Sequence, residues 1–88
     1  MILNKVIFTD NLPTLDLHGY DRETAQVAIA DFIRDNIKLK NEVIVIVHGI
    51  GSGILRKCTH DYLRKCKSVS EFKINYFNEG STLVAIKF

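Results

Sequence analysis

The pattern of apolar and polar positions predicts a strand, a helix and a second strand in the first half of the chain. Residues 14–18 alternate, with Leu15 and Leu17 on one face and Asp16 and His18 on the other. Residues 43–47 form an unbroken β-branched run, typical of a strand that is buried on both faces. Between them, apolar residues recur at helical spacing: Ala25, Ala28, Ile29, Phe32, Ile33 and Ile37. This βαβ arrangement predicts two parallel strands.

The second half predicts a further helix and two more strands. Ser52 is the expected N-cap of this helix. Its apolar stripe consists of Leu55, Cys58, Tyr62, Leu63 and Cys66. Residues 72–77 and 82–88 predict strands, joined by a hairpin turn at residues 78–81. The order βαβαββ predicts an α/β fold, a two-layer sandwich with a mixed sheet.

Length and composition predict one globular domain. The chain has 88 residues, of which 47% are hydrophobic and 25% charged. We expect a domain over residues 14–88 and an N-terminal arm over residues 1–13, in which residues 5–9 are apolar enough to pack. No apolar run approaches the roughly 20 residues of a membrane helix, and no signal-peptide core is present, so we expect a cytoplasmic protein without a membrane partner.

Two other features of composition bear on function. Cys58 and Cys66 are eight residues apart on one predicted helix, about 12 Å by helical rise, too far for a disulfide. The net charge is only +2, but residues 48–67 hold five basic side chains and one acidic one. This clustering is typical of a surface that binds an anionic ligand, including nucleic acid.

Two histidine-glycine pairs stand where a predicted strand ends and a helix follows, at His18-Gly19 and His48-Gly49. The carboxyl ends of parallel strands share one edge of a sheet, where α/β proteins bind ligands. A glycine-rich turn and a helix N-terminus there suit a phosphate group. Arg56 could add a forked donor to the phosphate oxygens. A tight turn that needs glycine for purely structural reasons is the alternative.

The same edge collects groups for acid–base chemistry. His18 and His48 could act as general acid and base on a phosphodiester, and Asp16 could orient a histidine or bind a metal. Each histidine could instead make a structural hydrogen bond. We expect only one carboxylate at this edge, His60 on the surface, and no zinc site, because the cysteines face the core.

These residues resemble the Smr (small MutS-related) family. The family signature L-D-L-H-G matches residues 15–19, H-G-x-G-x-G-x-L-R matches residues 48–56, and a third signature matches residues 80–86 loosely. The resemblance implies a fold similar to the C-terminal domain of translation initiation factor three. It also implies binding to DNA or RNA and, in several members, nicking endonuclease activity. The matching positions are Asp16, His18, His48, Gly49, Gly51 and Arg56. Ile50 departs from the basic residue of many members.

The leading hypothesis is therefore a nucleic-acid-binding domain that nicks DNA or RNA. The expected catalytic residues are Asp16, His18 and His48. The expected nucleic-acid contacts are Gly49, Gly51, Ser52, Gly53, Arg56, Lys57 and Arg64. No cofactor is expected, although the sequence leaves open whether a divalent cation binds at Asp16. It also leaves the oligomeric state open. The alternatives are a non-catalytic module for structured nucleic acid and a protein-interaction domain that docks on a ribosome. A small-molecule enzyme is disfavoured, because 88 residues leave little material to enclose a ligand.

Overall fold

The computed structural model describes residues 2–5 and 11–88. In chain order its elements are η1 (Ile2–Lys5), β1 (Thr14–Asp16), α1 (Arg22–Lys38), β2 (Val43–Val47), α2 (Ile54–Lys65), β3 (Val69–Asn75) and β4 (Asn78–Ile86). The strands form one sheet in the order β1-β2-β4-β3, in which β1 and β2 are parallel and β4 is antiparallel to both of its neighbours. The predicted α/β class, the βαβαββ order and the mixed sheet are confirmed.

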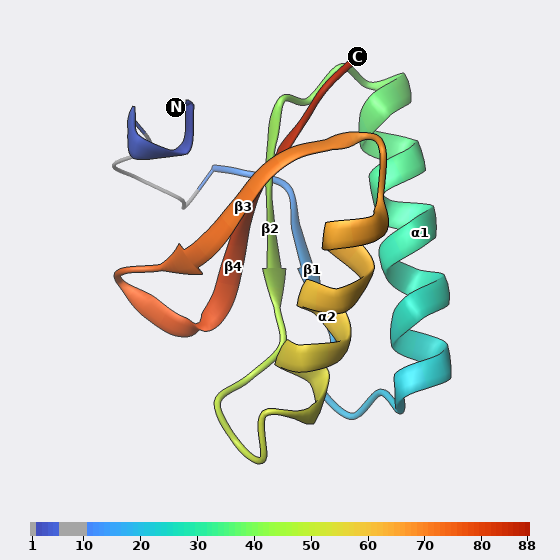
Figure 1. Ribbon diagram of the computed structural model, residues 1–88, viewed down its shortest axis with the longest axis vertical. Coiled ribbons are helices and arrows are strands. Elements are labelled where there is room, and N and C mark those ends of the chain that lie inside the picture. The colour runs from blue at the N-terminus through green and yellow to red at the C-terminus, as the bar shows by residue number, and fades with distance from the viewer. Residues whose placement is uncertain (1, 6–10) are drawn as a thin grey trace.

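The two helices pack on one face of the sheet, and the core lies between these two layers (Figure 1). The buried core residues on this face are Leu17, Ala25, Ile29, Ile33, Ile44, Ile46, Leu63, Val84 and Ile86. On the opposite face, Leu3 of η1 packs on Val45, Leu83 and Ala85. Residues on both faces of β2 are therefore buried, as its β-branched run predicts. Of the apolar segment expected at residues 5–9, residues 6–9 lie outside the described residues.

Helix α1 begins directly after Asp21. The Asp21 carboxylate accepts the backbone N–H of Thr24 at 2.8 Å and caps the helix. The helix ends at Lys38 with Leu39 as its C-cap, and the next residue, Lys40, adopts a positive φ of 58°. Within the described residues, neither helix is long and apolar enough to cross a membrane. Cys58 and Cys66 are both free thiols.

Helix α2 begins one residue later than expected, so the assignment of Ser52 as its N-cap is wrong. The N-cap is Gly53, which has a left-handed φ of 81° and provides no side-chain cap. The Ser52 hydroxyl lies 3.4 Å from the N–H of Ile54, too long for a strong cap. Because no side chain caps the helix, the N–H groups of its first turn are available to a ligand.

The hairpin turn also differs from the expectation, because it falls at Tyr76 and Phe77 and not at residues 78–81. Asn75 pairs with Asn78 across the hairpin, and its side-chain oxygen accepts the N–H of Phe77 at 3.0 Å. Strand β4 therefore begins at Asn78, and Gly80 belongs to this strand, beside the end of β2.

Candidate functional site

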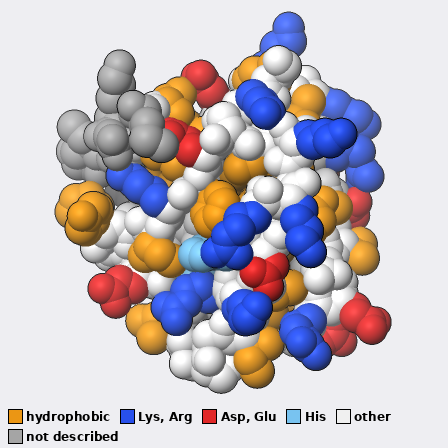
Figure 2. All heavy atoms as spheres, in the orientation of Figure 1, with side chains coloured by type: hydrophobic (Ala, Val, Ile, Leu, Met, Phe, Trp, Pro, Cys, Tyr) orange, Lys and Arg blue, Asp and Glu red, His pale blue; other side chains and the backbone are white. Residues whose placement is uncertain are grey.

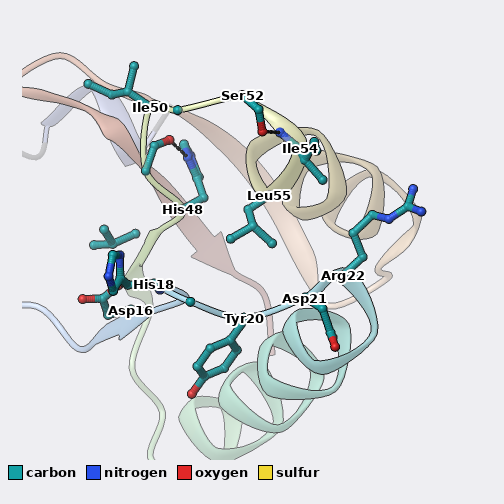
Figure 3. Close-up of a pocket in the computed structure, with 15 residues that line it drawn as sticks. Asp16, His18, Tyr20, Asp21, Arg22, His48, Ile50, Ser52, Ile54 and Leu55 are labelled. Atoms are coloured by element: carbon teal, nitrogen blue, oxygen red, sulfur yellow. Dashed lines mark hydrogen bonds between the residues drawn. The ribbon is translucent and has the colours of Figure 1, made fainter.

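An open pocket of about 810 Å³ lies beyond the carboxyl ends of β1 and β2 (Figure 3). Two segments line it, one after each of these strands: Asp16, His18, Gly19, Tyr20, Asp21 and Arg22, and then Val47, His48, Gly49, Ile50, Gly51, Ser52, Gly53, Ile54 and Leu55. Both histidine-glycine pairs thus lie at one edge, as their position after parallel strands predicts. The pocket brings together seven of the ten predicted site residues: Asp16, His18, His48, Gly49, Gly51, Ser52 and Gly53.

The first segment presents an exposed carboxylate and an exposed imidazole. Asp16 Oδ1 accepts the backbone N–H of His18 at 2.9 Å, which fixes the turn after β1. Among the described residues, the His18 ring has no hydrogen-bond partner, so both of its nitrogens face solvent or a ligand. Asp21 also lines the pocket. The expectation of a single carboxylate was therefore wrong, although Asp21 is already engaged as the cap of α1.

The second segment is held in place by the beginning of β4. The carbonyl oxygen of Gly80 accepts the N–H of His48 at 2.8 Å and that of Gly49 at 2.9 Å. Gly49 has a φ of 82°, and a Cβ atom added to Gly80 would lie 3.4 Å from the Gly49 backbone. Glycine at both positions thus permits this close approach of the two backbones.

His48 lies beneath this turn and is only 6% exposed. Its Nδ1 lies 3.0 Å from the carbonyl oxygen of Gly49, and its Nε2 lies 2.8 Å from the hydroxyl oxygen of Thr82. Because a carbonyl oxygen only accepts, Nδ1 carries the proton in the neutral ring. The Thr82 hydroxyl then donates to His48 Nε2, and both ring nitrogens of His48 are engaged.

His60 completes this cluster. It is half-buried, so it lies at the surface only in part, and its ring is engaged with Thr82. Its Nε2 lies 2.8 Å from the same Thr82 oxygen and donates to it. Its ring packs edge-on against His48, with centroids 5.8 Å apart, and lies 5.1 Å from the ring of Phe72. The buried face of α2 is wider than its apolar stripe, because Thr59 is also fully buried. A threonine on a strand whose neighbours are apolar was the sequence signal for a polar partner.

The surroundings favour the neutral form of the buried His48 ring and of the half-buried His60 ring. Burial lowers the pKa of His48, and the charge of Arg56 acts in the same direction, against the hydrogen bond to Gly49. Burial also lowers the pKa of His60, helped by His48, Arg64 and Arg56 and opposed by Asp61. Two neutral imidazoles and one hydroxyl therefore form a single directed chain, from His60 through Thr82 to His48.

The predicted cations lie on α2, over which Lys and Arg side chains gather at the surface in Figure 2. None of the three lines the pocket. Arg56 stays beside the glycine turn, with Nη2 3.4 Å from where a Cβ on Gly53 would be. Lys57 and Arg64 each bind Asp61 at 2.9 Å. Within the described residues, no group of three or more histidine, cysteine or acidic side chains is arranged to hold a metal ion.

The model of the Smr domain matches residues 15–87. This chain belongs to the Smr domain family. It is 37% identical over 73 residues to endonuclease MutS2 of Brevibacillus brevis and 39% identical over 72 residues to endonuclease MutS2 of a Geobacillus species. Each match covers 82% of this chain and 9% of the relative, so the chain spans about a tenth of these relatives.

Solved structures show the same fold. The Smr domain of Thermus thermophilus MutS2 superposes with a TM-score of 0.84 at 25% identity, over 86% of this chain and 99% of that one. YdaL, a stand-alone small MutS-related protein from Escherichia coli, superposes with a TM-score of 0.81 at 19% identity. That match covers 85% of this chain and 64% of YdaL.

Proposed function

We propose that this domain binds the phosphodiester backbone of a nucleic acid in the pocket and cleaves it. One observation carries the proposal: a single pocket joins an exposed carboxylate and an exposed imidazole to a glycine turn and an uncapped helix N-terminus. Membership of the Smr family supports it, because relatives that contain this domain are named endonucleases.

In the binding half of the proposal, backbone N–H groups hold a phosphate. The N–H of Gly49 is engaged by Gly80, but Gly51, Ser52 and Gly53 in the same turn offer such groups together with the positive end of the α2 dipole. Arg56 lies beside this turn and adds a forked cation. Further along α2, Lys57 and Arg64 contact the flanking phosphates and provide affinity without sequence preference.

In the chemical half of the proposal, His18 and Asp16 act on the phosphodiester. His18 is exposed in the pocket and exchanges a proton with the reacting oxygens. Asp16 fixes the His18 backbone and adds a negative charge to the lining of the pocket. His48 is buried with both nitrogens engaged, so we assign it the role of holding the glycine turn in position.

Binding without cleavage is the second candidate function, and the engagement of His48 favours it. A mechanism without a metal needs a nucleophile such as the RNA 2′-hydroxyl and benefits from two free acid–base groups. Among the histidines of the described residues, only His18 has both ring nitrogens free of hydrogen bonds and open to the pocket. Under this candidate, the pocket recognises the nucleic-acid backbone and leaves it intact.

Cleavage assays separate these possibilities. End-labelled DNA and RNA and supercoiled plasmid are incubated with the protein, with and without a chelator. The account predicts cleavage that either persists in chelator and needs the 2′-hydroxyl, or stops in chelator and extends to DNA. The second pattern would show that a divalent cation supplies the activated water, with Asp16 as its candidate ligand. Nicked rather than linear plasmid would show single-strand cutting. No cleavage despite binding supports the second candidate.

Matched variants connect the activity to the pocket. Asp16→Asn keeps an oxygen for the His18 N–H and removes only the charge, while His18→Ala removes the exposed ring. Each should slow cleavage by about 10²–10⁴-fold and change binding much less, because positioned acid–base groups act mainly on the chemical step. Lys38→Ala, at the far end of α1, is the control. Unchanged cleavage by the Asp16→Asn/His18→Ala double variant would contradict the chemical half of the proposal.

A further inference from the structure

Two aromatic side chains at the tip of the β3–β4 hairpin have no role in the core. Tyr76 is 87% exposed and Phe77 is 80% exposed. Two-residue hairpin turns favour residues such as Asn-Gly, and exposed aromatic rings add nothing to the hydrophobic stabilisation of the fold. A contiguous pair of exposed aromatic residues is instead typical of a binding surface.

This tip is connected to the pocket by a short, ordered backbone. Asn75 is 4% exposed and accepts the N–H of Phe77, and the Asn78 side chain accepts the N–H of Gly80 at 3.0 Å. The Gly80 carbonyl in turn binds the glycine turn of the pocket. Because Phe77 is three residues from Gly80, their Cα atoms are at most about 11 Å apart. A strand with one phosphate in the pocket would thus reach the two rings with a base only a few nucleotides away.

Cations accompany the aromatic rings on β3. The Lys73 ammonium lies 5.8 Å from the centroid of the Tyr76 ring. On the other face of β3, which packs on the helices, the Arg64 guanidinium of α2 lies 6.0 Å from the centroid of Phe72. Aromatic rings beside a cation are an arrangement by which proteins bind single-stranded nucleic acids, with bases stacked on the rings and phosphates on the cation, and at the hairpin this cation is Lys73.

We propose that Tyr76 and Phe77 stack on unpaired bases of the strand whose phosphate lies in the pocket, so that the domain selects single-stranded nucleic acid over duplex. The inference rests on the proposed function for its phosphate site. Bases in a duplex are already stacked and paired, so they do not present their faces to the hairpin. The two rings contact the flat faces of the nucleobases. The preference for unpaired bases therefore also applies to single-stranded segments that flank a duplex in a folded nucleic acid.

Fluorescence tests the stacking directly, because the chain contains no tryptophan. In Phe77→Trp the single indole replaces the exposed ring, and titration with single-stranded oligothymidylate should quench it. Phe88→Trp is the control, because Phe88 is 69% exposed but lies at the C-terminus, at the opposite end of the molecule from the glycine turn (Figure 1). Its emission should not change. A duplex of equal length should quench neither variant.

Affinity measurements complete the test. Tyr76→Ala/Phe77→Ala should weaken single-strand binding by about 5- to 150-fold for each stacking interaction removed, while duplex binding and the melting temperature stay the same. The dependence of affinity on salt should also be unchanged, because neither ring binds a phosphate.

The outcomes distinguish a failure of the stacking proposal from a failure of the proposed function. Binding that depends on Arg56 but neither quenches Phe77→Trp nor weakens in the double variant overturns the stacking and leaves the phosphate site standing. It would point to a protein partner for the hairpin. No binding of any nucleic acid overturns both proposals.

Discussion

The hydroxyl oxygen of Thr82 lies 2.8 Å from Nε2 of His48. The same oxygen accepts from Nε2 of His60, so one hydroxyl connects the end of β2, strand β4 and helix α2. This cluster lies beneath the glycine turn, and each of its members is needed to satisfy the others. The position of the candidate phosphate site therefore depends on a buried polar contact as well as on glycine.

Removal of the Thr82 hydroxyl should destabilise the domain. Thr82→Val keeps the shape of the side chain but leaves the Nε2 atoms of His48 and His60 without their partner. We expect a loss of about 1–3 kcal/mol in the free energy of unfolding, measured by urea denaturation. Thr82→Ser keeps the hydroxyl and should lose less. Equal stability of Thr82→Val and Thr82→Ser would contradict the shared hydrogen bond.

Stability should fall with acidification from near neutral pH. The pKa values of His48 and His60 are lowered in the folded state, chiefly by burial. As the pH drops below the unfolded value of about 6.5, the unfolded chain binds protons that the folded chain excludes, so the free energy of unfolding decreases. Denaturation across this pH range measures the effect.

A variant identifies the groups responsible for this pH dependence. His60→Gln should make the decrease below about pH 6.5 shallower, because one of the two excluded protons is gone. Asp21 and Asp61, whose pKa values are lowered from 3.8, contribute only in a separate and more acidic range. A pH profile that is the same in His60→Gln and the parent protein would contradict the role of His60.

The left-handed N-cap of α2 provides another test. Gly53→Ala places a Cβ at a φ of 81°, which should cost about 1–2 kcal/mol of stability. Gly51→Ala is the matched control, because Gly51 has an ordinary φ and no atom within 4 Å of its added Cβ. It should be neutral or slightly stabilising. Melting temperatures compare the two, and equal losses would contradict the difference in backbone conformation.

The strand and helix order was predictable because each element has a clear hydrophobic period. The run of residues 43–47 is apolar on both faces, and it occupies the interior of the sheet. The edge that holds Asp16, His18 and the glycine turn was also predictable, because parallel strands place their carboxyl ends together. These features depend on local sequence and on the general geometry of βαβ units.

Features that depend on tertiary contacts were not predictable in this way. The hairpin turn was misplaced because Gly80 looks like a turn residue, whereas it is needed for close approach to Gly49. The engagement of His60 was not predicted because its partner, Thr82, is 22 residues away in the chain. The pairing of Lys57 and Arg64 with a shared Asp61 is local by contrast, because these residues are four and three positions from Asp61 on α2.

That shared carboxylate leads to a prediction on affinity. Asp61→Asn removes the ion-pair partner of Lys57 and Arg64 and frees both cations. Nucleic-acid affinity should rise, and the log–log salt slope should steepen by about 0.7–0.9 for each additional phosphate that the freed cations bind. Asp31→Asn changes the charge equally and breaks the Arg34 pair on α1, so it is the control. If both variants bind alike, the α2 surface is not the phosphate-binding face.

The pocket itself is tested most directly by amide chemical-shift mapping. An ¹⁵N-labelled sample is titrated with a short single-stranded oligonucleotide, and each backbone amide is followed. The account predicts the largest shifts at His18 and at the turn of Gly49, Gly51 and Gly53, with the outer face of α1 unchanged. Saturable shifts confined to α1, or no shifts at the glycine turn when binding is complete, would contradict the proposal that this pocket holds the phosphate.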